Sequence, residues 1–405
     1  MTRVLTDAEA ADLDDLATEL SHLRATLAEA TERRRDAITR VPISQRASAI
    51  NLIQYLALRS RDERPLQRRL VGWGLSTLGR SEAHVAATLG AVQRSIALMR
   101  DQQVSIEPAP VDMSQAAAVA KSRVDELLGG APAHRVTRIM VTLPSEAATE
   151  PDMVYSLVAA GMDCARINTA HDDEATWKQM VTHVRSAADV LDASCRVLID
   201  LPGPKLRTGA IAPGPTGKEW IALARGDRLI LTSGAGDAPK RHRSSTSAHK
   251  LPRVACTLPA VLAQVQAGQP IWFDDGKIGG AIEDASPEEL TVLITHARAK
   301  GERLRSDKGI NLPQTAIDLP ALGADDLASL PFVARTADLV GLSFAQSPSD
   351  VRELRARLND LAAQQVGIVL KIETVRGFDA LPELILAGLE GGLVGVMIAQ
   401  RRPRR

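Results

Sequence analysis

A short apolar run that ends in an acid restricts the possible folds of this chain more than any other segment. Residues 197–200 read Val-Leu-Ile-Asp, without the alternation of a half-exposed strand, and this is typical of a strand buried on both faces. Pro202 and Gly203 then break the strand, and Lys205 and Arg207 follow in the turn. An acid, Asp200, at the carboxyl end of a buried strand with two cations beyond it indicates an anion site.

Similar apolar segments recur from residue 138 onward and alternate with amphipathic helical patterns. Alternation of this kind is typical of a parallel α/β barrel. We predict strands at residues 139–143, 164–168, 197–200, 339–344, 368–373 and 393–399. One intervening helix is predicted to begin at Pro348, with Ser347 as its cap. Its predicted buried face consists of Val351, Leu354, Leu358 and Leu361.

Residues 1–130 have helical patterns and no evident catalytic group. Thr6 and Glu9 match a capping box, and an apolar stripe follows. The stripe consists of Leu13, Leu16, Leu20, Leu23 and Leu27. It is short for a coiled coil, so we expect it to pack against the next helix of the same chain. Further helices are predicted at 47–59 and 82–100, and residues 125–134 are predicted to form a hinge.

The strand–helix alternation lapses between residues 210 and 306. This stretch is rich in Gly, Thr and Val, with short strand patterns at 228–231 and 269–273 and a turn signal at 274–276. A small β domain inserted after the third barrel strand would explain the change. We therefore expect five parts: a helical extension (1–130), the first part of the barrel (135–209), the inserted β domain (210–306), the second part of the barrel (307–399) and a basic tail (400–405).

The composition narrows the classes of function. Lys and Arg together number 49, as do Asp and Glu, so the net charge favours neither nucleic acid nor membrane surfaces. The three cysteines lie far apart without a Cys-x-x-Cys pair, which argues against a zinc site or a disulfide framework. Cys164 and Cys195 lie in apolar runs and are predicted to be buried thiols. No apolar segment has the pattern of a signal peptide or the length of a membrane span, so we expect a cytoplasmic protein.

Charged residues cluster where the predicted strands end. Arg166 and Asn168 are two positions apart and share one strand face, as do Lys371 and Glu373, while Asp200 closes a third strand. Catalytic residues of α/β barrels lie at the carboxyl ends of the strands. A carboxylate there can hold a hard divalent ion, and a cation beside it can neutralise charge on a transferring phosphoryl group.

Several segments also follow one another in a recognisable order. They read Arg166-Ile-Asn-Thr-Ala-His171, Gly203-Pro-Lys-Leu-Arg-Thr-Gly209, Phe273-Asp-Asp-Gly-Lys-Ile278, Lys308-Gly-Ile-Asn-Leu-Pro313 with Asp318-Leu-Pro320, Leu342-Ser-Phe344 with Ser349-Asp-Val351, and Lys371-Ile-Glu373. In this order they resemble the barrel and lid segments of pyruvate kinases, over residues 138–399. The resemblance implies phosphoryl transfer from phosphoenolpyruvate to ADP, giving pyruvate and ATP, with the inserted β domain as a lid.

The resemblance also implies roles for single residues. Lys371 and Arg166 would be catalytic, with Lys371 stabilising the transferring phosphoryl group and the enolate. Arg207 and Ser343 would bind the phosphate or substrate. Glu373 would ligate Mg²⁺ or Mn²⁺.

A monovalent-cation site is implied as well, with a departure from the family pattern. Asn168 and Asp200 fall at positions that line it. Where the family has a serine that ligates the cation, this chain has Ala170. Where the family commonly has the acid of a Gly-Pro-Glu turn, this chain has Lys205. Members with lysine at that position resemble the potassium-independent type, because the ammonium replaces the ion. We therefore expect that K⁺ is not required.

The last predicted strand departs further from the family. It should continue into Arg-Gly-Asp-Leu, whose acid is the second metal ligand, but residues 400–405 read Gln-Arg-Arg-Pro-Arg-Arg. We therefore expect six barrel strands of the usual eight, open sheet edges, and activity impaired by truncation. Two alternatives remain open: an inactive homologue that acts only through protein contacts, and a metal-dependent lyase or aldolase of pyruvate-like substrates. We expect no nucleic-acid partner, and the chain could form a homo-oligomer.

Overall fold

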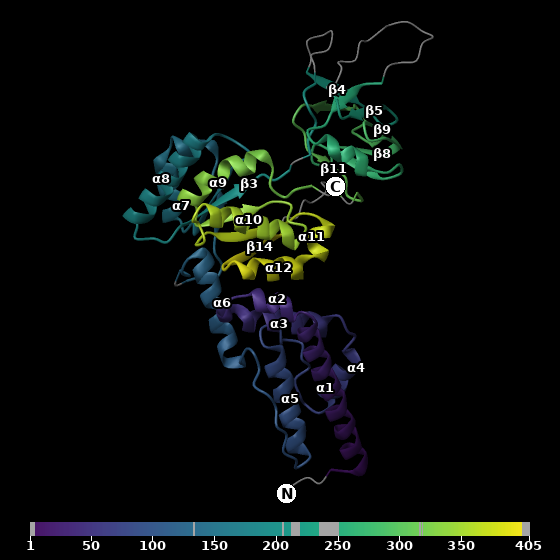
Figure 1. Ribbon diagram of the computed structural model, residues 1–405, viewed down its shortest axis with the longest axis vertical. Helices are drawn as coiled ribbons and strands as arrows, with labels where there is room; N and C mark the ends of the chain where they lie inside the picture. The colour runs from purple at the N-terminus through teal and green to yellow at the C-terminus, as the bar shows by residue number, and fades with distance from the viewer. Residues whose placement is uncertain are drawn as a thin grey trace.

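The computed structural model describes residues 5–132, 134–204, 206–211, 219–234, 251–315, 317 and 319–398. Three groups of elements follow one another in space (Figure 1): N-terminal helices at one end, a parallel sheet covered by helices in the middle, and a group of mostly antiparallel strands at the other end. The helices α1–α6 are called the helical unit below, and the strands β4–β11 are called the β unit.

Six parallel strands form a curled sheet in the order β1-β2-β3-β12-β13-β14. They are β1 (Met140–Thr142), β2 (Cys164–Asn168), β3 (Arg196–Leu201), β12 (Leu339–Leu342), β13 (Gly367–Ile372) and β14 (Val394–Ile398). All four residues of β12 and all six of β13 are buried, as expected for strands covered on both faces. The predicted incomplete α/β barrel is thereby confirmed.

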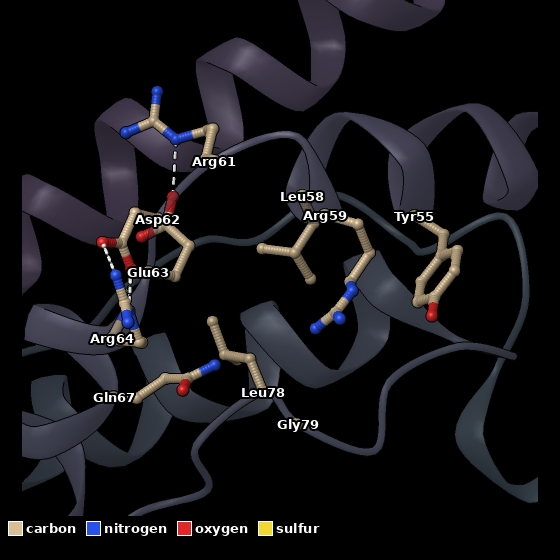
Figure 2. Close-up of a pocket in the computed structure, with 10 residues that line it drawn as sticks. All are labelled: Tyr55, Leu58, Arg59, Arg61, Asp62, Glu63, Arg64, Gln67, Leu78 and Gly79. Atoms are coloured by element: carbon tan, nitrogen blue, oxygen red, sulfur yellow. Dashed lines mark hydrogen bonds and ion pairs between the residues drawn. The ribbon is translucent and has the colours of Figure 1, made fainter. Parts of the chain in front are cut away.

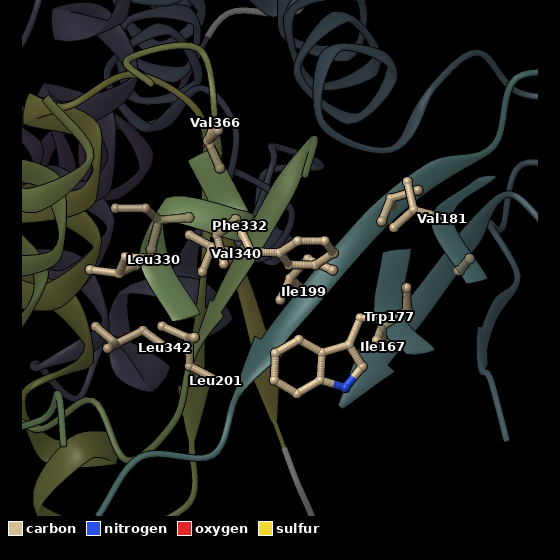
Figure 3. Close-up of a cluster of buried hydrophobic side chains, with 14 of the residues drawn as sticks. Ile167, Trp177, Val181, Ile199, Leu201, Leu330, Phe332, Val340, Leu342 and Val366 are labelled. Atoms are coloured by element: carbon tan, nitrogen blue, oxygen red, sulfur yellow. The ribbon is translucent and has the colours of Figure 1, made fainter. Parts of the chain in front are cut away.

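Helices cover the outer face of this sheet. They are α7 (Pro151–Ala159), α8 (Glu174–Val190), α9 (Ala324–Thr336), α10 (Pro348–Asp360), α11 (Val375–Asp379) and α12 (Leu381–Glu390), with the 3₁₀ turn η1 (Ser145–Ala148). The core between the layers includes Trp177 and Phe332, whose ring centroids are 5.8 Å apart (Figure 3). The predicted buried face of α10 is confirmed for Val351, Leu354 and Leu358. It is wrong for Leu361, which is 40% exposed and lies just beyond the end of α10 at Asp360, so it no longer continues the buried face of the helix.

The inner face of the sheet is closed at one end by α6 (Met113–Leu128). Leu127 packs there with residues of four strands: Cys164, Leu198, Leu339 and Val369. Gly367 and Gly395 make this approach feasible, because a Cβ on them would lie 3.2 and 2.7 Å, respectively, from the Leu127 side chain. The predicted hinge at 125–134 is wrong in its first part, since α6 continues to Leu128 and ends at Gly129, where φ is +84°.

The N-terminal leucine stripe packs within its own chain, as predicted. It lies on α1 (Asp7–Arg33), whose capping box of Thr6 and Glu9 is present, and it faces α3 (Ile43–Arg59) and α5 (Val85–Met99). Two short helices complete this layer, α2 (Arg35–Arg40) and α4 (Arg64–Gly72). The helix predicted at 82–100 begins later, at Val85, where Asn51 of α3 accepts a hydrogen bond from the Val85 amide at 2.9 Å.

The helical unit rests on α12 (Figure 1). Leu386 of α12 is 3% exposed and packs among apolar residues of α1–α3 and their connections: Ala30, Ile38, Val41, Ala49 and Ile53. Two ion pairs flank this contact, Arg34–Glu383 at 2.6 Å and Arg40–Glu390 at 2.8 Å. None of the helices in the described ranges is both long and apolar enough to cross a membrane.

The β unit has its own apolar core. Its strands are β4 (Trp220–Leu223), β5 (Arg228–Thr232), β6 (Arg253–Ala255), β7 (Pro270–Phe273), β8 (Ile278–Ala285), β9 (Glu289–His296), β10 (Glu302–Arg305) and β11 (Ile310–Asn311), with the 3₁₀ helix η2 (Pro259–Gln264). The predicted turn is present, since Asp274, Asp275 and Gly276 all have positive φ. Two crossing segments join the unit to the sheet, with Arg207 opposite Gly309 and Thr208 opposite Cys256.

All three thiols are buried, and their burial makes the stability of the fold depend on pH. Burial raises the pKa of Cys164 from 9.0 to about 12 and that of Cys195 from 9.0 to about 11. The folded chain therefore holds these protons more tightly than the unfolded chain. The resulting stabilisation is complete below about pH 9 and is lost as the pH rises through 11 to 12.

We expect the free energy of unfolding to decrease above pH 9, because the unfolded thiols ionise there first. We also expect the native chain to react with Ellman's reagent at pH 8 only through unfolding. Reaction of any thiol at the rate of free cysteine in the native state would contradict the burial.

Candidate active site

Five polar side chains meet at the carboxyl ends of neighbouring strands, as the sequence predicts. The set is called the strand-end cluster here and consists of Arg166, Asp200, Ser343, Lys371 and Glu373. The parallel register explains the meeting, because Asp200 lies opposite Asn168 on one side and Gly341 on the other. Gly341 is required by this packing, since a Cβ there would lie 2.6 Å from Asp200 Oδ1.

Asp200 is the centre of the cluster. Its side chain is 1% exposed and is paired with two cations. Arg166 donates from both Nε, at 2.9 Å, and Nη2 to Asp200 Oδ2. Lys371 Nζ lies 3.0 Å from Oδ1 and donates to Oδ2 at 3.1 Å. A buried carboxylate needs such compensation, because its transfer from water is costly when it is unpaired.

Lys371 is held in one position by its neighbours. It is 6% exposed and donates a hydrogen bond to Ser343 Oγ at 2.7 Å, and Ser343 donates in turn to the Leu201 carbonyl at 2.6 Å. Its ammonium also lies 4.0 Å from Glu373 Oε1, which is an ion-pair distance without a hydrogen bond. A cation fixed by packing and by a short chain of hydrogen bonds needs little reorganisation to meet an anion.

Glu373 follows β13, and one of its oxygens has a structural task. Oε2 accepts a hydrogen bond from the Phe344 amide at 3.2 Å, at a residue in the left-handed region with φ +54°. Oε1 accepts no hydrogen bond from any described residue, and as a hard oxygen atom it is the kind of ligand that divalent cations bind. Mg²⁺ is commonly held by one or two carboxylates together with substrate phosphates. Glu373 therefore fits a divalent ion, although no group of three or more His, Cys, Asp or Glu in the described ranges forms a complete site.

The described residues predicted to line a monovalent-cation site make local hydrogen bonds. Asn168 Oδ1 accepts a hydrogen bond from the Ala170 amide at 3.1 Å, which closes a local turn. The main-chain oxygen of Asp200 accepts hydrogen bonds from the amide and the hydroxyl of Thr169, at 3.1 and 3.0 Å. Lys205 lies outside the described residues, so the prediction about its ammonium stays a prediction.

The structure does not bring Arg207 into the strand-end cluster. Its guanidinium pairs with Asp307 at 2.7 Å, where the chain passes between the sheet and the β unit. Asp307 is 74% exposed, so this ion pair is open to water and weak. Arg207 can exchange this partner for a ligand at little cost.

Sequence reasoning missed Asp326, which positions the turn after β3. It is 1% exposed at the start of α9, and its two oxygens accept hydrogen bonds from the amides of Gly323 at 2.7 Å and Gly203 at 3.1 Å. The Gly-x-x-Asp spacing at 323–326 is a capping signal that could have located the helix start. It could not have shown that the same carboxylate holds Gly203, because that contact joins residues 123 positions apart.

Fold and site together define a class: an α/β-barrel protein whose strand ends carry fixed cations and a carboxylate suited to an anionic substrate with a metal ion. Comparison of the sequence with known protein families identifies the family. Residues 134–401 match the family model for the pyruvate kinase barrel domain, and the chain belongs to the pyruvate kinase family.

Known relatives agree with this assignment. The chain is 32% identical over 251 residues to a pyruvate kinase of Mycobacterium tuberculosis. The matched region covers 62% of this chain and 48% of that protein. It is 30% identical over 280 residues to a pyruvate kinase of Corynebacterium efficiens (66% and 54%), and 28% identical over 260 residues to human pyruvate kinase PKLR (62% and 42%). The matches therefore span about half the length of these relatives.

Replacing Asp200 should destabilise the protein strongly. Asp200→Ala leaves Arg166 and Lys371 close together without their shared anion, and removing one partner of a buried ion pair costs about 3–5 kcal/mol. Urea unfolding followed by circular dichroism would measure the change in the free energy of unfolding. The matched control is Asp189→Ala on the exposed face of α8, which should change it by less than about 0.5 kcal/mol. Equal effects of the two substitutions would show that the cluster does not stabilise the sheet.

Proposed function

We propose that the strand-end cluster transfers a phosphoryl group between phosphoenolpyruvate and ADP, giving pyruvate and ATP. The observation that carries the proposal is the buried ammonium of Lys371, held between Asp200, Ser343 and Glu373 at the end of β13. Membership of the pyruvate kinase family supports it.

The proposed roles follow from the hydrogen bonds. A lysine ammonium has three donors. Asp200 and Ser343 accept from Lys371, which leaves one donor for a phosphoryl or enolate oxygen of the substrate. Arg166 adds a second fixed positive charge at the same carboxylate. These charges are in place before the substrate arrives, and preorganised charge of this kind stabilises a transition state.

In this proposal Glu373 would hold Mg²⁺ or Mn²⁺, which would supply positive charge to neutralise the phosphoryl oxygens. Glu373 keeps Oε2 on the Phe344 amide, so the carboxylate is already oriented. Residues 399–405, where the family pattern has its second acid, lie outside the described residues.

We further propose that residues 210–306 act as a lid over the strand ends, with 135–209 and 307–399 forming the barrel, 1–130 a helical extension and 400–405 a basic tail. The support is that the β unit has a separate apolar core and joins the sheet through two short crossing segments next to Arg207. A separate core with a narrow connection permits movement as a body.

Lys371→Met tests the proposed function. We expect ATP formation from phosphoenolpyruvate and ADP, measured on the 405-residue chain with Mg²⁺, to fall by about 10²–10³-fold, because one preorganised donor is removed. Binding of phosphoenolpyruvate, measured by calorimetry, should weaken less than the rate falls.

Lys178→Met, on the exposed face of α8, is the matched control and should leave both quantities unchanged. Turnover of Lys371→Met at the parental rate, or an effect confined to KM, would remove the proposed role of Lys371. Absence of both phosphoenolpyruvate binding and ATP formation in the parent chain would reject the proposed function for this chain.

We propose in addition that activity does not require K⁺. Ala170 offers no hydroxyl oxygen to an ion, and Asp200 is already paired with two cations. Phosphoenolpyruvate binding and ATP formation in buffer with only tetramethylammonium as monovalent cation should match those with KCl. The double substitution Ala170→Ser with Lys205→Glu should create a dependence on K⁺. Strong activation of the parent chain by KCl would contradict the proposal.

A further inference from the structure

A pocket of about 390 Å³ lies in the helical unit, where α3 ends and α4 begins (Figure 2). Three arginines line it: Arg59, Arg61 and Arg64. It is built entirely from residues 55–79, so it shares no residue with the strand-end cluster. Nothing in the proposed phosphoryl transfer uses these residues.

The three arginines of the pocket differ in whether they have an ion-pair partner. Arg61 pairs with Glu63 at 2.5 Å, and Arg64 pairs with Asp62 at 2.7 Å. The Arg64 guanidinium lowers the pKa of Asp62 to about 2, so this pair persists at neutral pH. The Arg59 side chain forms no ion pair or hydrogen bond with any described residue, and in Figure 2 its guanidinium points between Leu58 and Leu78. One positive charge at this concave site, exposed to water, is therefore left without a partner among the described residues.

The walls on either side of Arg59 are apolar and firmly held. Leu58 is 6% exposed and Leu78 is 5% exposed, and both belong to the core that contains the leucine stripe. Leu78 has φ +62°, a left-handed conformation that is unfavourable for leucine. Its carbonyl accepts a hydrogen bond from Ser81 Oγ at 2.8 Å, which helps to hold this conformation. Strained residues of this kind cluster at ligand sites.

We propose that this pocket binds a small organic phosphate that carries an apolar ring. The phosphate pairs with Arg59, whose planar guanidinium offers two parallel donors to phosphate oxygens. The side chains of Gln67 and Tyr55, which also line the pocket, supply further hydrogen-bond donors. The ring lies against Leu58 and Leu78. The site is independent of the proposed catalytic function.

Calorimetry with three probes on the full chain tests the site: inorganic phosphate, phenyl phosphate and phenol. We expect phenyl phosphate to bind at least tenfold more tightly than either other probe, because only it engages both the arginine and the apolar walls. Arg59→Gln should weaken phenyl phosphate binding at least tenfold. Arg80→Gln changes an exposed cation just outside the pocket and should change the affinity less than twofold.

The proposal fails if phenyl phosphate at 10 mM, about tenfold above a millimolar Kd, gives no saturable heat with the folded parent chain. It also fails if Arg59→Gln and Arg80→Gln weaken binding equally, since that result would indicate only general attraction to positive charge. Circular dichroism checks that both variants fold. Leu78→Gly provides a second test, because it relieves the left-handed strain but removes one wall, and it should weaken phenyl phosphate while leaving inorganic phosphate unchanged.

Discussion

The buried carboxylate of Asp200 determines how the strand ends are arranged. It lies near the end of β3 and pairs with Arg166 from β2 and with Lys371 from β13, so ion pairs link three strands at their carboxyl ends in addition to the backbone pairing. The strand between them, β12, contributes Gly341, whose missing side chain leaves room for the carboxylate. Asp200 pairs with both cations, and its own burial depends on them, because an unpaired buried carboxylate is costly.

At the opposite end of the strands, glycines again leave room for a side chain that packs against the sheet. Leu127 of α6 reaches the inner face of the sheet beside Gly367 and Gly395, where side chains would collide with it. The helical unit also holds α12 through Leu386 on the outer face, next to the edge strand β14. The N-terminal helices therefore contact the sheet layer on both faces: Leu127 packs against four strands on the inner face, and Leu386 of α12 packs into the helical unit on the outer face.

The sequence predicted the sheet and the meeting of polar side chains at its strand ends, because both depend on local patterns. Buried runs ending in Asp200 and in Lys371 and Glu373 specify strands and their polar ends, and the parallel register brings them together without further information. Contacts between distant segments were beyond such reasoning. The Asp326–Gly203 hydrogen bond, the ion pair of Arg207 with Asp307 and the insertion of Leu127 each join segments whose proximity no local pattern encodes.

The charge of the strand-end cluster limits what it can bind unaided. Arg166 and Lys371 carry two positive charges, and Asp200 and Glu373 carry two negative charges, so the cluster is neutral. A substrate with several negative charges would meet no net attraction there, and Glu373 would repel it at short range. In the proposed function, two sources of positive charge would offset this: a divalent ion on Glu373, and the Arg207 guanidinium, whose ion pair with the exposed Asp307 is weak. Under the proposed function, the neutrality of the cluster is therefore a reason to expect that a metal ion on Glu373 and the Arg207 guanidinium both take part in binding such a substrate.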